Sequence, residues 1–168
     1  MPIVTLFGDG GVFWIAVAVV LLLFAKYRKT GFSMGMALVL GLLVCNILLK
    51  PQVARIRPYN FQLQEYGREI TLLVKGLNDY SFPSGHTCAA FAAGMIWARA
   101  LPVRWMRAAA AVLALCMGLS RLYVGVHYLT DVLAGAVVGT LCAWAAWKIG
   151  LMIVGYWKRQ AANKKEVQ

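Results

Sequence analysis

Apolar residues are gathered into five long blocks that are separated by short polar or basic stretches. The blocks cover approximately residues 2–25, 32–49, 85–98, 108–119 and 127–147, and the last one continues toward residue 157. A membrane-spanning helix needs about 20 predominantly apolar residues. The third and fourth blocks reach that length only if their polar ends, at Ser84, His86 and Arg121, also lie within the membrane. We therefore predict an all-α, polytopic transmembrane helix bundle of about five spans, formed by one domain over residues 1–168.

Basic residues are concentrated in the connections on one face of this predicted bundle. With five spans, the turn at 26–29, the turn at 99–107 and the tail at about 158–168 all fall on the same side. The positive-inside rule makes that side cytoplasmic. The segment 52–82 then faces outward, where its other basic residues are balanced by acidic ones: Arg55, Arg68 and Lys75 against Glu65, Glu69 and Asp79.

Composition supports a membrane protein and argues against a nucleic-acid-binding one. Hydrophobic residues make up 61% of the chain and the mean hydropathy is +0.69, whereas soluble domains contain about 45–50% apolar residues. The net charge of +11 lies mostly between or after the apolar blocks, and no nucleic-acid-binding motif accompanies it. The four cysteines lie inside or at the edges of the blocks without metal-ligand spacing, which indicates small core residues: Cys45, Cys88, Cys116 and Cys142.

Three short segments carry residues that can do chemistry, and each falls at the predicted outer end of a helix. They read KPQVARIRP over residues 50–58, PSGH over 83–86, and SRLYVGVHYLTD over 120–131. Ionisable residues at membrane depth are costly and usually functional. These segments are therefore the candidate site.

The cations of these segments predict an anion-binding site. Lys50, Arg57 and Arg121 have no acidic residue nearby in the sequence to pair with them, and phosphate matches both the fork of arginine and the point charge of lysine. Ser84 and Gly85 stand where a helix begins, so that backbone N–H groups also favour an anion there. The absence of a side chain at Gly85 lets the backbone approach closely.

The two histidines of the chain supply a candidate nucleophile and a candidate acid. His127 and Asp131 are four residues apart, so on a helix they share a face and can hydrogen-bond. A carboxylate that holds one imidazole nitrogen leaves the other free to attack, and His86 is then available as a general acid. Each feature alone has a structural explanation, as a membrane anchor, a helix cap or a packing residue. Their convergence on one membrane face favours function.

Taken together, the three segments resemble the type 2 phosphatidic acid phosphatase superfamily in all of its signature motifs. The pattern K-x6-R-P, P-S-G-H and S-R-x5-H-x3-D is matched at every position, and it spans residues 50–131, about half of the chain. The resemblance implies an all-α membrane fold with an extracytoplasmic active site and no metal or other cofactor. Many bacterial members carry a further helical segment before the first block.

The resemblance also implies a role for each matching residue. His127 attacks phosphorus to give a phosphohistidine and Asp131 orients it. His86 protonates the leaving group and later activates water. The phosphoryl oxygens are held by the remaining motif residues: Lys50, Arg57, Ser84, Gly85 and Arg121.

Three classes of function remain open at this stage. A lipid phosphatase or diphosphatase accounts for every motif. A vanadate-dependent haloperoxidase shares this kind of anion site, but such enzymes are soluble and larger. An anion transporter explains the cations but neither the pair of His127 and Asp131 nor the Ser-Gly-His turn.

The partners that we expect are membrane lipids and a lipid phosphate or diphosphate. An outward-facing site in a compact, bacterial-looking chain suits undecaprenyl diphosphate, in the inner membrane with the site toward the periplasm. Phosphatidylglycerophosphate, phosphatidic acid and lipid A phosphates stay open, because the motifs recognise only the phosphate. Gly135 and Gly139 form a small-xxx-small pair that can mark a homo-oligomer face, although packing within the chain is favoured.

Overall fold

The structure, a computed structural model, describes residues 11–74 and 76–166. The start of the first apolar block lies outside these residues. Within them every regular element is a helix, which confirms the all-α prediction for the described part of the chain. In chain order the helices are α2 (Val12–Leu23), α3 (Arg28–Gly41), the π-helix η2 (Leu42–Leu49), α4 (Lys50–Val53), α5 (Pro58–Tyr66), α6 (Gly85–Ala100), α7 (Arg104–Tyr123) and α8 (Leu129–Glu166).

The long helices fall in the five apolar blocks, and two of them include the polar block ends. The short helices α4 and α5 lie outside the blocks. α7 continues through Arg121 and reaches 20 residues, while α6 begins at Gly85, includes His86 and has 16. In the described residues three stretches are long and apolar enough to cross a membrane: Arg28–Tyr66, Arg104–Tyr123 and Leu129–Tyr156. The count of five spans stays a prediction.

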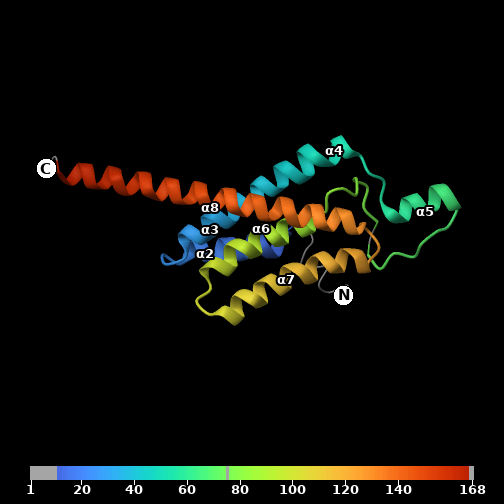
Figure 1. Cartoon of the computed structure of the whole chain (residues 1–168), viewed down its shortest axis with the longest axis horizontal. Helices are drawn as coiled ribbons and strands as arrows, with labels where there is room; N and C mark the ends of the chain where they lie inside the picture. The colour runs from blue at the N-terminus through green and yellow to red at the C-terminus, as the bar shows by residue number, and fades with distance from the viewer. Residues whose placement is uncertain (1–10, 75, 167–168) are drawn as a thin grey trace.

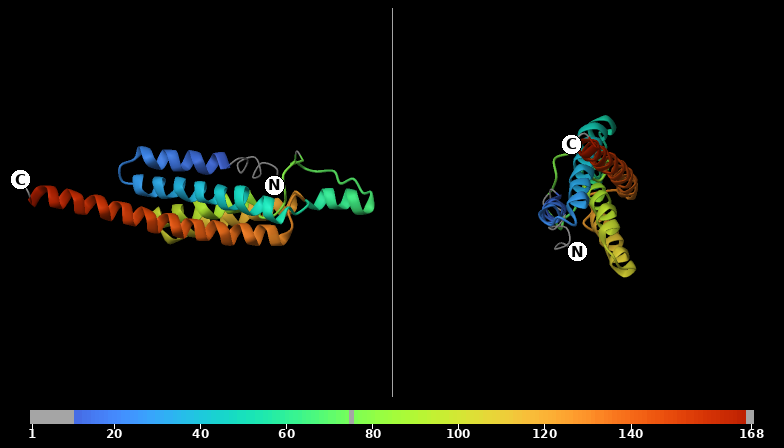
Figure 2. Two further views of the ribbon diagram at one scale, coloured as in Figure 1. Left: turned by 90° about the horizontal axis from the view of Figure 1, so that it is seen from above. Right: turned by 90° about the vertical axis from the view of Figure 1, so that its left-hand side faces the viewer.

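The long helices lie alongside one another and alternate in direction (Figures 1 and 2). The connections at 24–27 and 101–103 lie at one end of the bundle, and those at 54–57, 76–84 and 124–128 lie at the other. The C-terminal part of α8 extends beyond the first end, and α5 extends beyond the second (Figure 2). This alternation brings the three motif segments together at one end and the basic turns together at the opposite end.

The core is rich in alanine, with the larger side chains of Trp14, Met34, Ile96 and Met117 among them. It is centred on α6, which packs against α3, α7 and α8. Gly135 and Gly139 of α8 face this helix: a Cβ at Gly135 would lie 2.5 Å from the backbone oxygen of Ser84, and one at Gly139 would meet the backbone oxygen of Cys88. Neither backbone atom can move aside. The glycine pair therefore packs α8 against α6 within the chain, and it fixes the start of α8 beside the PSGH segment.

The outer surface of the bundle is strongly apolar. Along α8, side chains at four-residue intervals are more than half exposed, namely Leu129, Leu133, Val137 and Leu141. A contiguous exposed stripe of this kind is unfavourable in water and fits the hydrocarbon of a bilayer. Cys45, Cys88 and Cys142 are buried free thiols, as expected for small core residues.

Candidate active site

A backbone reversal after α4 directs the first motif segment into the bundle. Ala54 ends α4 in the left-handed region, with φ 48°, a conformation that non-glycine residues adopt infrequently. After this turn Arg55 and Arg57 point back toward α8 and the turn that precedes it. Pro58 then starts α5, where its fixed φ and missing N–H suit a first helical position.

Arg57 is buried and held almost entirely by backbone oxygens. Its Nε donates to the carbonyl of Asp79 at 2.8 Å, its Nη1 to that of Val126 at 2.9 Å, and its Nη2 to that of Tyr80 at 3.3 Å. Its side chain is 1% exposed. These bonds fix a guanidinium at the junction of the segment 76–84 and the turn before α8.

Asp79 pairs with two of the cations, which corrects the expectation that no acidic residue lies near them. Its Oδ2 accepts from Lys50 Nζ, and its Oδ1 accepts from Arg57 Nη2 at 2.6 Å. Asp79 is 29 and 22 residues from these partners, so the contact depends on how the loop folds back. Burial alone would raise the pKa of this carboxyl, but hydrogen bonds from Lys50 and Arg57 outweigh it and leave the pKa below its usual value.

His127 and Asp131 are in contact, although the helical geometry that we expected for them is wrong. His127 lies in the turn before α8, and only Asp131 is helical, in the first turn. The carboxylate reaches back so that Oδ2 lies 3.5 Å from His127 Nδ1 and accepts from the backbone N–H of Tyr128 at 2.9 Å. This is a capping arrangement in which an acidic side chain at the third helical position accepts from the N–H of the residue before the helix.

The Asp131 carboxylate has two further partners that the motif does not include. Ser81 Oγ donates to Oδ2, and Arg55 Nη1 donates to Oδ1 at 2.8 Å. The carboxylate is fully buried, so these bonds stabilise a charge that would otherwise be costly at this depth. Asp131 is therefore fixed from both sides while it faces the imidazole.

The opposite nitrogen of His127 faces the cations. Nε2 lies 3.5 Å from Arg57 Nη1, and with the proton on Nδ1, toward Asp131, Nε2 keeps its lone pair. Burial lowers the pKa of His127 and the charge of Arg57 adds to this, while the hydrogen bond with Asp131 opposes it. The pKa lies below the usual histidine value, so the imidazole is neutral at neutral pH, as a nucleophile must be.

The PSGH segment begins α6 and contributes to the site mainly through Gly85 and His86. Ser84 is the N-cap: its Oγ accepts from the N–H of Thr87 at 3.4 Å and from Thr87 Oγ1 at 2.9 Å. A Cβ at Gly85 would lie 2.8 Å from Asn46 Oδ1, so glycine lets the polar side chain of Asn46 approach the helix start. Ser84 is buried behind this surface, and its predicted contact with phosphate stays a prediction.

Arg121 lies in the last turn of α7 and is buried, 2% exposed, with Nε 3.5 Å from Ser120 Oγ. It is not among the residues that line the cavity described next. Its role in holding phosphate therefore also stays a prediction.

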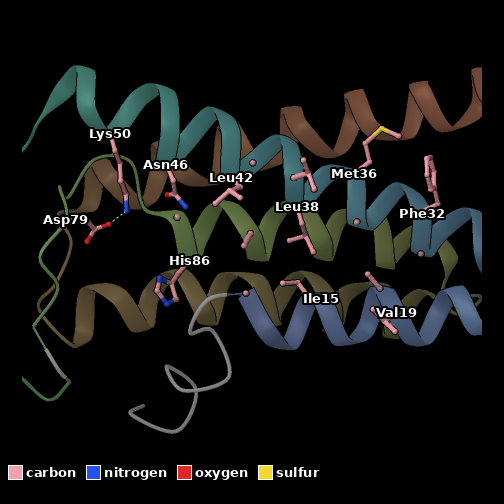
Figure 3. A pocket seen from close by; sticks show the side chains of 18 of the residues that line it. Ile15, Val19, Phe32, Met36, Leu38, Leu42, Asn46, Lys50, Asp79 and His86 are labelled. Carbon is pink, nitrogen blue, oxygen red and sulfur yellow. Dashed lines mark hydrogen bonds and ion pairs between the residues drawn. The ribbon is translucent and has the colours of Figure 1, made fainter.

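A cavity of about 850 Å³ runs from this site along the inside of α2 and α3 (Figure 3). Its polar end is lined by five predicted site residues, which are Lys50, Arg57, Gly85, His86 and His127, together with Asp79 and Asn46. Away from that end the lining is apolar and includes Leu38, Leu42, Ile15, Val19 and Phe32. Leu38, Leu42, Asn46 and Lys50 follow one another at four-residue intervals, so that one helical face changes from apolar to cationic along the cavity.

Sequence reasoning missed four residues at this site. Asp79 and Ser81 stand shortly before the PSGH motif, and Arg55 stands two residues before Arg57. Asn46 is the one polar residue within the second apolar block, 32–49, other than Ser33. That isolated polarity was a usable signal, whereas the partners of Asp79 and Arg55 depend on the path of the loop.

Comparison with known proteins gives relatives with three different activities in their names. An undecaprenyl-diphosphatase of Sulfolobus acidocaldarius is 33% identical over 127 residues, which are 76% of this chain and 58% of that protein. A lipid A 4'-phosphatase of Bacteroides thetaiotaomicron is 30% identical over 103 residues, 60% of this chain and 45% of that protein. A phosphatidylglycerophosphatase B of Bacillus subtilis is 34% identical over 125 residues, 68% and 56% of the two chains. This chain thus spans about half the length of these relatives.

The fold is also that of a solved membrane phosphatase. The crystal structure of a transmembrane PAP2-type phosphatidylglycerolphosphate phosphatase from Bacillus subtilis superimposes with a TM-score of 0.68 at 26% identity, over 89% of this chain and 74% of that one. With the apolar helices described above, these likenesses identify a membrane protein. The family model for the PAP2 superfamily matches residues 26–154, and the chain therefore belongs to the PAP2 superfamily.

Proposed function

We propose that this chain is a metal-independent lipid phosphatase that transfers a phosphoryl group from a lipid phosphate or diphosphate to His127 and then to water. One observation carries the proposal. A single cavity, among those lined by described residues, has two cations and two imidazoles at one end and an apolar lining along the rest. Phosphate fits the first part and a hydrocarbon chain fits the second.

The first chemical step is attack by His127 on phosphorus. Nε2 forms the P–N bond while the bond from phosphorus to the leaving oxygen breaks. His86, on the first turn of α6, donates a proton to that oxygen. Asp131 holds Nδ1 and stabilises the positive charge that the imidazole acquires.

The second step is hydrolysis of the phosphohistidine, in which His86 acts as a base instead of an acid. His86, now neutral, takes a proton from water, the water oxygen bonds to phosphorus, and the P–N bond breaks to release phosphate and regenerate His127. Negative charge on the phosphoryl oxygens is stabilised throughout by Lys50, Arg57 and the N–H of Gly85 at the cavity wall, and by Arg121.

Undecaprenyl diphosphate is the substrate that we favour. The relative from Sulfolobus acidocaldarius carries the name of this activity, and a cavity of about 850 Å³ takes part of a long prenyl chain. The names of the other relatives support a second candidate, a phosphomonoester on a glycerophospholipid or on lipid A. Both candidate substrates would bind at the same site, because its polar end contacts only the phosphoryl group.

A panel of purified lipids tests this proposal. The full-length chain is given undecaprenyl diphosphate, phosphatidylglycerophosphate, phosphatidic acid and lipid A in turn, and phosphate release is measured with an excess of EDTA. We expect release from at least one lipid, undecaprenyl diphosphate fastest, undiminished by EDTA and blocked by vanadate. Complete loss on chelation, restored by magnesium, would contradict the mechanism.

We further propose that the site faces outward in a bacterial inner membrane. The basic turns lie at the end of the bundle opposite the site, and basic connections remain cytoplasmic. Gln64→Cys and Gly67→Cys, at exposed positions at the site end, should react with an impermeant thiol reagent in intact cells. Val103→Cys, exposed at the basic end, should react only after lysis, and the reverse pattern would place the site in the cytoplasm.

A further inference from the structure

We propose that Asp79 is an internal competing anion that selects for phosphoryl groups carrying two negative charges. This inference rests on the proposed function and names a specificity-determining residue for it. The Asp79 carboxylate occupies donors of Lys50 and Arg57 that a phosphoryl group needs, so a ligand binds only by displacing it. Figure 3 shows Asp79 and Lys50 together at the polar end of the cavity.

The two carboxylate oxygens accept hydrogen bonds from the two cations, as two phosphoryl oxygens would. One oxygen accepts from Lys50 Nζ and the other from Arg57 Nη2. The residue also lines the cavity, along with His86 and His127. The pKa of Asp79 lies below its usual value because the hydrogen bonds from both cations outweigh its partial burial, so the competing charge is present at neutral pH.

This carboxylate is placed so that it can leave without disturbing the site. The Asp79 side chain is 51% exposed, whereas those of Lys50 and Arg57 are 12% and 1% exposed. Arg57 keeps three bonds to backbone oxygens, including the carbonyl of Asp79 itself. Rotation of the Asp79 side chain therefore frees the two donors while the loop and the guanidinium stay in place. The buried Asp131 carboxylate, fully enclosed by its donors, has no such freedom.

Displacement favours ligands according to their charge. A phosphodiester headgroup carries one negative charge, the same as Asp79. Replacing the Asp79 carboxylate with such a headgroup therefore adds little electrostatic attraction to Lys50 and Arg57. A phosphomonoester carries about 1.5 to 2 negative charges at neutral pH, and a diphosphate carries more, so these ligands gain attraction to Lys50 and Arg57. A membrane-embedded site is surrounded by phosphodiester lipids. The Asp79 carboxylate lowers the affinity of the site for their headgroups and so prevents them from blocking it. The returning carboxylate also helps to expel the phosphate product.

Removal of the carboxylate tests this role. The Asp79→Asn variant of the full-length chain is compared with the wild type for inhibition of p-nitrophenyl phosphate hydrolysis by inorganic phosphate and by vesicles of phosphatidylglycerol. We expect phosphate to inhibit the variant at roughly tenfold lower concentration, since one charge-assisted contact corresponds to about a decade in affinity. We also expect phosphatidylglycerol to inhibit the variant and not the wild type.

Three matched variants complete the design. Glu65→Gln removes the same charge from the exposed face of α5 and should behave as wild type. Asp79→Glu keeps the charge and should retain most of the discrimination. Asp79→Ser also removes the carboxylate, and it replaces Asp79→Asn in the test if that variant does not fold.

The outcomes separate this inference from the proposed function. Calorimetric binding of inorganic phosphate to the purified variants provides a readout that does not depend on turnover. Unchanged or weaker phosphate binding in folded Asp79→Asn would overturn the inference and show that Asp79 instead positions the cations. A wild-type chain that neither binds phosphate nor hydrolyses any lipid phosphate would overturn both.

Discussion

Arg55 and Asp131 are joined across the site by a hydrogen bond of 2.8 Å from Arg55 Nη1 to Asp131 Oδ1. The same guanidinium donates to Thr130 Oγ1 at 2.6 Å and lies 3.8 Å from the ring centroid of Tyr128. Arg55 thus contacts Tyr128, Thr130 and Asp131 around the start of α8. It orients the carboxylate that in turn faces His127.

Arg55 should act on turnover by positioning Asp131. We expect Arg55→Ala to lower kcat about tenfold with little change in KM, because one charged hydrogen bond to the orienting carboxylate is lost. Arg55→Lys should recover part of kcat, since an ammonium can still donate to Asp131. Steady-state kinetics with p-nitrophenyl phosphate measure both, with Arg68→Ala on the exposed loop as the control. A rise in KM at constant kcat would instead make Arg55 a substrate-binding residue.

The apolar part of the cavity should matter only to substrates with a hydrocarbon chain. Leu38→Trp fills the lining beyond the cations, and excluding even two methylene groups costs about tenfold in binding. We expect a KM roughly tenfold higher for lipid substrates and unchanged hydrolysis of p-nitrophenyl phosphate. Val137→Trp, on the exposed face of α8, provides the control. Equal losses on both substrates would mean that the substitution disturbs the catalytic end.

The protonation state of His127 can be measured directly, because the chain contains two histidines and His86→Ala leaves one. Nuclear magnetic resonance titration of that imidazole should give a pKa below about 6.5, since burial and the charge of Arg57 disfavour the imidazolium. Adding Asp131→Asn should lower it further, because a bond that favours the charged form is removed. As pH falls through this pKa the nucleophile is protonated and turnover is lost. A midpoint above about 6.5 would contradict the effects of burial and of Arg57 on this pKa.

The sequence was sufficient to predict the long helices and to bring out residues that the structure places at one end of the cavity. Runs of apolar residues predict membrane helices because the bilayer requires them, so α2, α3, α6, α7 and α8 fall where the five blocks predicted. His86 and His127 were recognisable because ionisable residues are rare beside such runs. The alternation of helix direction then brings Lys50, His86 and His127 to one end of the bundle.

Contacts that depend on the loop path could not be predicted in the same way. Asp79 was interpreted as balancing charges in an outward segment, yet it pairs with Lys50 and Arg57 because residues 76–84 fold back over the site. His127 was placed on a helix by its spacing from Asp131, although the turn before α8 achieves the same contact through capping. In both cases the residue types indicated which groups carry charge or bind protons. The spacing along the sequence did not predict the geometry of their contacts.

The rate loss caused by removing His86 should depend on how strongly the leaving group of the substrate requires a proton. We expect His86→Ala to slow the first-turnover release of the lipid alcohol from a lipid phosphomonoester by roughly 10²–10⁴-fold, the usual contribution of general acid catalysis. The first-turnover release of p-nitrophenolate should slow much less, because that leaving group is stable as an anion. Rapid-mixing measurements of the first turnover test this, since the later hydrolysis of the phosphoryl-enzyme is common to both substrates. Equal losses would show that His86 is not the acid.

In the proposed mechanism the phosphoryl group passes through His127, and the His86→Ala variant offers the most direct test. Attack on p-nitrophenyl phosphate does not need His86, but activation of water does, so the intermediate should accumulate. The variant is mixed rapidly with this substrate, quenched in base, and analysed by mass spectrometry of the peptide that contains His127. We predict a burst of p-nitrophenolate equal to one equivalent of enzyme and an acid-labile phosphoryl group on His127, both absent when His127→Ala is added. A phosphoryl group on another residue, or product formation with no phosphorylated intermediate, would contradict the account.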